Sequence, residues 1–120
     1  MVTETRPIVK NLSDIEQKAI SEFLARVRST YGTQLQRAML FGSKARGEAT
    51  AGSDIDVAVI LEDETWEIRD EICKVGADIS LQYDVLLDAR VFSVARWKYM
   101  SEIRAGLYQN ISSDAIPLAG

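Results

Sequence analysis

The residues best suited to chemistry are two aspartates, Asp54 and Asp56, at the start of an apolar run. Alternate residues of a strand point to the same face, which would place the two carboxylates about 6.5–7 Å apart along it. Like charges at that separation repel, and one carboxylate tends to protonate unless a cation lies between them. Mg²⁺ prefers oxygen ligands and is commonly held by one or two carboxylates together with substrate phosphates. The pair therefore predicts a divalent-metal site.

The alternative is that both aspartates lie on the solvated face of an edge strand, and the Asp-Ile-Asp triplet alone favours that interpretation. Ala58 and Ile60 continue the same face, because side chains alternate along a strand. A face that continues with apolar residues is not simply polar surface, and this favours the metal site.

A second candidate segment is the pair Gly42-Ser43, which follows an apolar run and precedes Lys44 and Arg46. Glycine lets backbone N–H groups approach an anion, with the serine hydroxyl beside them. The segment is not a P-loop, since Gly-Lys-Ser/Thr is absent, and alone it indicates only a turn. Arg46 has two equal interpretations, a phosphate contact or a tie to Glu48, whereas Lys44 is expected to be solvated.

The elements that must position these residues follow from hydrophobic periodicity. Ser13 and Glu16 form a capping-box pattern that begins a helix, and Gly32 ends it. In the second strand Ile55 and Val57 share one face, opposite to the face of the aspartates. The predicted order is a helix at 13–31, strands at 35–41 and 54–62, a helix at 63–83, a strand at 84–92 and a helix at 93–107.

This order predicts the α+β class, with a small mixed or antiparallel sheet flanked by helices. The link between the first two strands is too short for a full helix, which permits antiparallel pairing. We expect a leader at 1–12, a domain at 13–110 and an irregular C-terminal tail at 111–120.

Composition excludes several classes of function. The 120 residues carry a net charge of -4 without a Lys/Arg-rich run, so nucleic acid is not expected as the main partner. The absence of histidine excludes Ser-His-Asp and Cys-His catalysis and any histidine-based zinc site. The single cysteine, Cys73, is expected to be a buried hydrophobe in a reducing cytoplasm. No signal peptide or membrane span is predicted.

Taken together, the two candidate segments are far more specific than either alone. Gly42-Ser43, ten residues, and then Asp54-Ile55-Asp56 resembles the signature of the polymerase-beta-like nucleotidyltransferase superfamily. The runs LFGSKARG at 40–47 and SDIDV at 53–57 resemble its small members, the minimal nucleotidyltransferase (MNT) proteins. A weaker pattern at 103–108 resembles the end of such domains, which extends the resemblance loosely over 13–108.

The resemblance implies a division of labour in the site. Gly42 and Ser43 would hold the triphosphate of ATP, with Arg46 as a further phosphate ligand. Asp54 and Asp56 would coordinate Mg²⁺.

A third carboxylate from a later strand would complete the metal site and assist deprotonation of the acceptor. Asp84 and Asp88 share a face of the third predicted strand by parity. The step Leu87-Asp88-Ala89 resembles the apolar-Asp-apolar step of the family and favours Asp88. Asp84 is the alternate, and is otherwise a turn residue that begins the strand.

MNT proteins are commonly paired with a helical HEPN-type partner and act as its antitoxin, some of them by attaching AMP to the toxin. The resemblance therefore implies transfer of AMP from ATP to a partner protein. The alternative is a binding subunit that neutralises its partner by contact, supported by the uncertain third carboxylate. A small-molecule transferase resembling aminoglycoside-modifying enzymes is disfavoured, because no acceptor domain is expected. The acceptor, the base preference and the oligomeric state stay open.

Overall fold

A four-stranded mixed sheet organises this computed structural model, which describes residues 12–48 and 53–119. Its strands are β1 (Leu35–Phe41), β2 (Ile55–Leu61), β3 (Leu87–Ser93) and β4 (Ile116–Ala119). They lie in the order β3-β2-β1-β4. β1 pairs antiparallel with β2 and with β4, whereas β2 pairs parallel with β3. The sheet confirms the expected α+β class.

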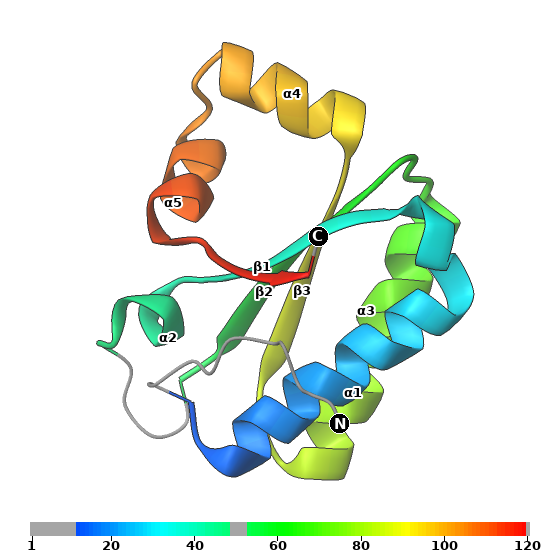
Figure 1. Ribbon diagram of the computed structural model, residues 1–120, viewed down its shortest axis with the longest axis vertical. Coiled ribbons are helices and arrows are strands. Elements are labelled where there is room, and N and C mark those ends of the chain that lie inside the picture. Colours follow the sequence, from blue (N-terminus) through cyan, green and yellow to red (C-terminus); the bar gives the residue numbers. More distant parts are fainter. Residues whose placement is uncertain (1–11, 49–52, 120) are drawn as a thin grey trace, which may run out of the picture.

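Helices cover both faces of the sheet (Figure 1). They are α1 (Asp14–Tyr31), the single turn α2 (Ser43–Arg46), α3 (Trp66–Tyr83), α4 (Val94–Glu102) and α5 (Gly106–Asp114), with a 3₁₀ turn at Gly32–Gln34. α1 and α3 lie together on one face, while α4 and α5 lie on the other (Figure 1). α3 connects the parallel strands β2 and β3, as such a pairing requires. No helix of the described residues is both long and apolar enough to cross a membrane.

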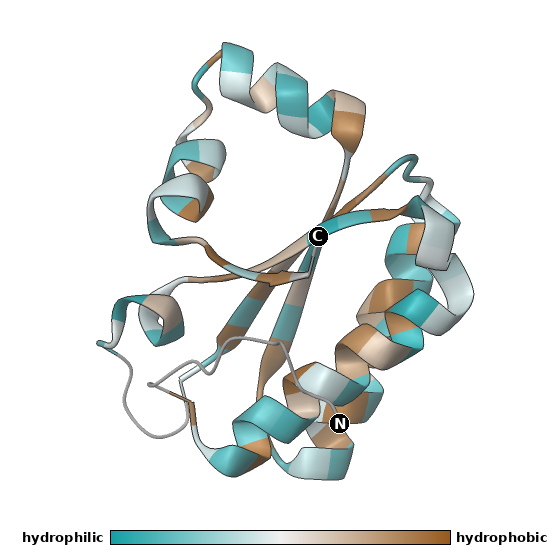
Figure 2. Ribbon diagram, in the orientation of Figure 1, coloured by the Kyte–Doolittle hydropathy of each residue, from teal (hydrophilic) through white to brown (hydrophobic). Residues whose placement is uncertain are grey.

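The two faces of β2 belong to two separate cores. Ile55 and Val57 pack with α1 and α3 in the larger core, whereas Ala58 and Ile60 pack with residues of α4 and α5 in the smaller one. Apolar residues accordingly follow the strands and the inner sides of the helices in Figure 2. The alternation predicted for this strand is confirmed. The face of β2 that carries the aspartates is therefore covered by α4 and α5 at Ala58 and Ile60.

Local signals set the helix ends. Ser13 and Glu16 form the predicted capping box at the start of α1, and Gly32 follows its last residue. α3 begins at Trp66 rather than at the acidic pair 63–64, because Thr65 is the residue whose side chain accepts a backbone N–H. Leu12, expected in the leader, is buried in the larger core.

The C-terminal segment differs most from expectation. The single helix expected at 93–107 is two helices, separated at Arg104, whose φ is +55°. Residues 111–120 were expected to be irregular, yet α5 continues to Asp114 and β4 adds an antiparallel strand to β1. Pro117 is compatible with this strand because β4 lies at the edge of the sheet.

Candidate active site

The turn between β1 and α2 lies directly against one of the aspartates. Gly42 has φ of +80°, and a Cβ at this position would overlap the Asp56 Oδ2 atom. Only glycine combines this backbone conformation with so close an approach. The turn is closed by Arg46 N–H donating to Gly42 O (3.1 Å) and Glu48 N–H donating to Ser43 O (3.0 Å). The two segments separated by ten residues therefore form one site.

Strand register brings the third carboxylate to the other two. Asp56 of β2 stands opposite Asp88 of β3 in the parallel pairing, and Asp54 lies one residue before β2. Each of the three offers a carboxylate oxygen, and these oxygens lie within 4.8 Å of one another. Asp54 is exposed, while Asp56 and Asp88 are half-buried.

Asp84, the alternate third carboxylate, lies outside this cluster. It ends α3 in the left-handed conformation, with φ of 54°, and its side chain is exposed. β3 begins only at Leu87, so two residues separate Asp84 from the strand. The geometry thus joins Asp88, and not Asp84, to Asp54 and Asp56.

Electrostatics of the cluster fit a bound cation. Burial raises the pKa of Asp56, and the negative charges of Asp88 and Asp54 raise it further. Arg90 and Arg46 act in the opposite direction on that pKa. Three oxygen ligands of one sign at this spacing match the preference of Mg²⁺ for carboxylates. The donor set therefore fits a divalent metal held by the three aspartates.

Lys44 is the clearest correction to the sequence analysis. Expected to be solvated, it is 5% exposed, and its Nζ lies 2.6 Å from Glu16 Oε2. Glu16 also accepts the backbone N–H of Ser13 at Oε1 (2.9 Å). Burial opposes the charge of Glu16, but the hydrogen bonds from Lys44 and Ser13 outweigh it and hold its pKa below the ordinary value. The buried pair ties α2 to the start of α1.

Arg46 Nε donates to Glu48 Oε1 at 2.9 Å, which confirms one of the two contacts considered for Arg46. Its Nη1 also donates to Asp114 Oδ2 at 2.7 Å, across 68 positions of sequence. This partner was missed because the segment around Asp114 was expected to be an irregular tail. The phosphate contact proposed for Arg46 stays a prediction.

The surroundings of two further residues near the site, Arg90 and Cys73, were not predicted from the sequence. Arg90 Nε lies 3.5 Å from Asp88 Oδ2, so a positive charge on a side chain that is 52% exposed lies beside the carboxylates. Its position two residues after Asp88 on one strand could have indicated this. Cys73 is exposed and not buried.

The arrangement has a direction across the sheet. The Gly42-Ser43 turn follows β1, Asp56 lies on the central β2, and Asp88 lies on β3. The glycine turn therefore stands on one side of the carboxylates and the edge of β3 on the other. This order suits transfer of a phosphoryl-type group, in which attacking and leaving oxygens lie on opposite sides of phosphorus.

Known proteins are similar to this chain in sequence. The profile of the family described as "Nucleotidyltransferase domain" matches residues 20–113. "Putative protein adenylyltransferase MJ0604" of Methanocaldococcus jannaschii is 37% identical over 78 residues, which cover 65% of this chain and 74% of that protein. "Putative protein adenylyltransferase MJ0141" of the same organism is 32% identical over 74 residues, 61% of this chain and 75% of that protein.

Solved structures agree in fold. "Structure of putative minimal nucleotidyltransferase" aligns with a TM-score of 0.54 at 25% identity, over 88% of this chain and 97% of that one. A toxin–antitoxin structure with AMP-PNP aligns with a TM-score of 0.58 at 23% identity, over 82% and 72% of the two chains. A tri-AMPylated Shewanella oneidensis HEPN toxin in complex with MNT antitoxin gives 0.55 at 21% identity, over 87% and 71%. Because the family profile covers most of its length, the chain belongs to the nucleotidyltransferase domain family.

Proposed function

We propose that this chain is a Mg²⁺-dependent nucleotidyltransferase that moves AMP from ATP to a hydroxyl group of a partner protein, as the antitoxin of a HEPN/MNT pair. The observation that carries the proposal is the cluster of Asp54, Asp56 and Asp88 oxygens within 4.8 Å, beside the turn at Gly42. The names of the two archaeal relatives support AMP as the group and a protein as the acceptor. The AMP-PNP and tri-AMPylated HEPN structures support ATP and a HEPN-type partner.

The proposal gives each residue a role that suits its place in the sheet. Gly42 and Ser43, after β1, hold the β- and γ-phosphates, and Arg46 is the additional phosphate ligand. Asp54, Asp56 and Asp88 hold Mg²⁺, which when bound supplies positive charge to the phosphates and to the attacking oxygen. Asp88 lies farthest from the turn across the sheet, on the side where the acceptor enters.

The proposed reaction is one displacement at the α-phosphorus of ATP. The acceptor oxygen forms the new bond to phosphorus, the bond from phosphorus to the bridging oxygen breaks, and pyrophosphate leaves towards Gly42 and Ser43. Asp88 accepts the proton of the acceptor hydroxyl. The products are the AMP-modified acceptor and pyrophosphate.

The test is incubation of the chain with α-labelled ATP, Mg²⁺ and the protein encoded beside it. Label is expected on the partner, and Asp56→Asn lowers the rate about 10²–10³-fold, as the loss of a group that stabilises developing charge does. Asp84→Asn is the matched control, since it makes the same change outside the cluster, and it keeps the rate. Equal rates in the two variants would show that the carboxylate cluster is not the site.

The non-catalytic antitoxin is the competing proposal, and its main support was the uncertain third carboxylate. The register that places Asp88 opposite Asp56 weakens that support. The same experiment separates the two. Growth protection from the partner that survives in Asp56→Asn, with no label transferred by the unaltered chain, favours neutralisation by contact.

A further inference from the structure

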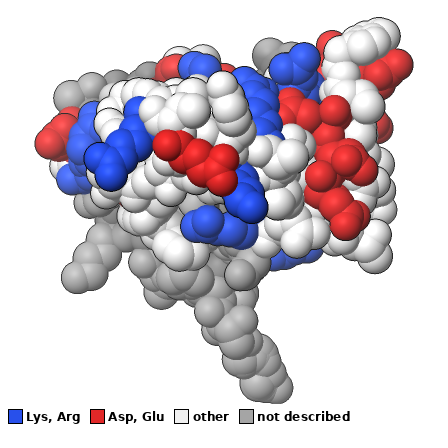
Figure 3. Space-filling model, turned by 90° about the horizontal axis from the view of Figure 1, so that it is seen from above, with Lys and Arg blue, Asp and Glu red and all other residues white. Residues whose placement is uncertain are grey.

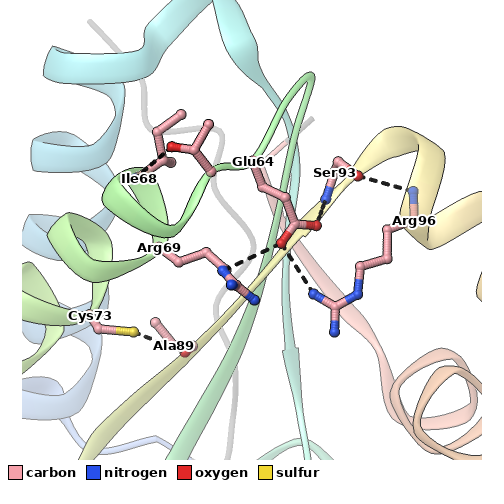
Figure 4. Close-up of polar contacts among 8 residues, drawn as sticks. Glu64, Ile68, Arg69, Cys73, Ala89, Ser93 and Arg96 are labelled. Carbon is pink, nitrogen blue, oxygen red and sulfur yellow. Dashed lines mark hydrogen bonds and ion pairs between the residues drawn. The ribbon is translucent and has the colours of Figure 1, made fainter.

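A pocket of about 220 Å³ lies at the outer edge of β3, next to the carboxylate cluster but separate from it. Its walls come from α3, β3, α4 and α5, and Figure 4 shows four of its residues, Arg69, Cys73, Ala89 and Arg96. The residues that line it are Arg69, Cys73, Ala89, Arg90, Val91, Phe92, Arg96 and Leu107. None of these residues is a metal or phosphate ligand in the proposed transfer.

The charge of the pocket is positive in an acidic chain. Arg69 Nε lies 3.7 Å and Arg96 Nη1 3.1 Å from Glu64 Oε2, and Arg90 Nε lies 3.5 Å from Asp88 Oδ2. The residues that line the pocket thus include three guanidinium groups and no carboxylate, and the paired Glu64 and Asp88 lie outside that lining. The three arginines are about half exposed, and each guanidinium has five N–H donors, more than these pairs use. The pocket is therefore suited to an anion.

Glu64 shows that a carboxylate fits between the arginines of the pocket. Its carboxylate is largely buried, accepts the backbone N–H of Ser93 at 2.6 Å, and lies between the two arginines of α3 and α4 (Figure 4). The chain itself thus places a carboxylate between Arg69 and Arg96. Across the face seen in Figure 3, blue and red side chains intermix and form no broad basic surface. This favours individual carboxylates over a polyanion such as nucleic acid.

The strand edge beside the pocket is open in the middle. Ile55 N–H donates to Leu86 O (2.7 Å), so in this parallel ladder the even-numbered residues turn their backbone groups to β2 and the odd-numbered ones turn outward. At one end Leu87 N–H donates to Ser80 Oγ (3.0 Å). At the other end Glu64 accepts Ser93 N–H.

Val91 lies between these closed ends. Among the described residues, no hydrogen bond reaches its outward-facing N–H or C=O. The neighbouring Ala89 C=O has only the thiol of Cys73, at 3.9 Å. Val91 as a whole is 6% exposed, but the pocket borders this stretch of the edge, and a strand edge with unpaired backbone groups is a template for an added strand. A short extended segment could therefore pair with residues 89–91 while its side chains reach the arginines.

The pocket lies on the acceptor side of the site. The phosphate-binding turn follows β1, and the sheet order places β3 on the opposite side of the carboxylates. Arg90 belongs to the pocket and contacts Asp88, the carboxylate proposed to take the proton of the acceptor. A chain bound along β3 would thus pass beside the reacting group.

We propose that this pocket binds an extended acidic segment of the acceptor protein, which pairs with the backbone of β3 around Val91 and places its carboxylates on Arg69, Arg90 and Arg96. That the segment belongs to the acceptor rests on the proposed nucleotidyl transfer; the binding of an acidic strand does not. The segment would position the acceptor hydroxyl towards Asp88.

The test uses the full chain labelled with ¹⁵N and a synthetic hexapeptide in which glutamate alternates with threonine. Without ATP or Mg²⁺, saturable shifts are expected at the Val91 amide. Replacing a glutamate that contacts an arginine by glutamine weakens binding about tenfold, because one charge-assisted hydrogen bond is lost. Arg69→Gln in the chain has an effect of the same size for the same reason. The matched control is Arg26→Gln, because Arg26 also lies on a long helix and pairs with a carboxylate, Asp78, at 3.4 Å. It leaves the affinity unchanged.

A second readout does not depend on NMR. Cys73 is the only cysteine of the chain, is exposed and lines the pocket. Bound peptide is therefore expected to slow its alkylation by iodoacetamide, and the glutamine peptide to do so less. Equal protection by both peptides, or equal affinities of Arg69→Gln and Arg26→Gln, would overturn the proposal. So would a single-stranded oligonucleotide that displaces the acidic peptide from Arg69.

Failure of this proposal is distinguishable from failure of the proposed function. If Arg69→Gln transfers AMP to the partner with an unchanged KM for the partner, the proposed peptide site is wrong and the proposed nucleotidyl transfer stands. If the peptide binds at Val91 but no AMP is transferred to the partner, the proposed peptide site stands and the proposed nucleotidyl transfer is wrong.

Discussion

The two sides of the carboxylate cluster are held in different ways. On the β1 side, Gly42 packs against Asp56 without room for a Cβ, and Lys44 is buried on Glu16. On the β3 side, the charged contacts of Arg69 and Arg90 are half exposed and longer. Buried pairs of good geometry fix positions, whereas exposed pairs contribute little and exchange partners readily.

This difference matches two kinds of ligand. A nucleotide has an invariant triphosphate, so a rigid turn next to the metal ligands gives a fixed position for the reacting phosphorus. A protein acceptor brings its own surface, and exposed arginines beside an open strand edge can adapt to it. The comparison predicts that changes on the β1 side disturb stability and nucleotide use, while changes on the β3 side disturb acceptor binding alone.

The largest effect is expected from Gly42→Ala. The added Cβ overlaps Asp56 Oδ2, and alanine disfavours the positive φ of this residue. We expect a loss of about 1–3 kcal/mol in the free energy of unfolding and at least about a hundredfold loss of transfer rate. Denaturant unfolding and labelled-ATP transfer measure the two.

Gly106→Ala is the control for this change, since a Cβ there meets nothing within 4 Å and the residue begins α5. Equal behaviour of the two alanine variants would show that the contact between the turn and Asp56 does not constrain the site.

The next effect concerns the buried ion pair. Lys44→Met keeps a long apolar stem but leaves the carboxylate of Glu16 without its cation, which destabilises by about 1–3 kcal/mol. Because α2 loses its tie to α1, we expect KM for ATP to rise while the affinity for the acidic peptide at Val91 stays constant. Denaturant unfolding and steady-state kinetics test this.

A double variant sharpens the result. Glu16→Gln combined with Lys44→Met leaves no buried charge unpaired, so part of the stability should return. Lys44→Arg, which keeps the charge, should retain more nucleotide affinity than Lys44→Met. An additive double variant would mean that the two residues act independently.

The parts of the site that sequence could predict are those governed by local rules. Alternation along β2 placed Asp54 and Asp56 on one face with Ala58, and the capping box began α1 at Ser13. Parity also placed Asp84 and Asp88 together. The structure separates them, because Asp84 ends α3 before β3 begins, and the register of β3 against β2 sets Asp88 opposite Asp56.

What sequence could not predict depends on contacts between distant segments. The burial of Lys44 requires α1, whose Glu16 precedes it by 28 positions (44 − 16). β4 is a short strand whose residues gain partners only where β1 offers an edge, so its own pattern carried little signal. Cys73 was assigned to the apolar side of its helix, but that part of α3 faces the open edge of β3.

A smaller effect is expected at the contact between α2 and α5. Asp114→Asn removes one of two carboxylates from Arg46, while Glu48 stays in place. The loss of stability should be small, as for other exposed pairs, and removing an acid from the C-terminal end of α5 offsets some of it. Thermal unfolding and KM for ATP measure the change. A rise in KM without loss of peptide affinity at Val91 assigns Asp114 to the nucleotide side.

The smallest effect is a pH dependence that separates folding from catalysis at Asp56. Burial, Asp88 and Asp54 raise its pKa in the folded, metal-free chain. Stability from its protonated form is therefore fully present below the unfolded pKa and is lost as pH rises through the folded pKa. At neutral pH the metal-free Asp56→Asn variant should unfold at a slightly higher temperature than the unaltered chain, with the difference vanishing below pH 3.8, the ordinary value. Mg²⁺ should then stabilise the unaltered chain and the Asp84→Asn variant, but not the Asp56→Asn variant. A metal-free variant less stable than the unaltered chain at neutral pH would mean that the three carboxylates do not repel.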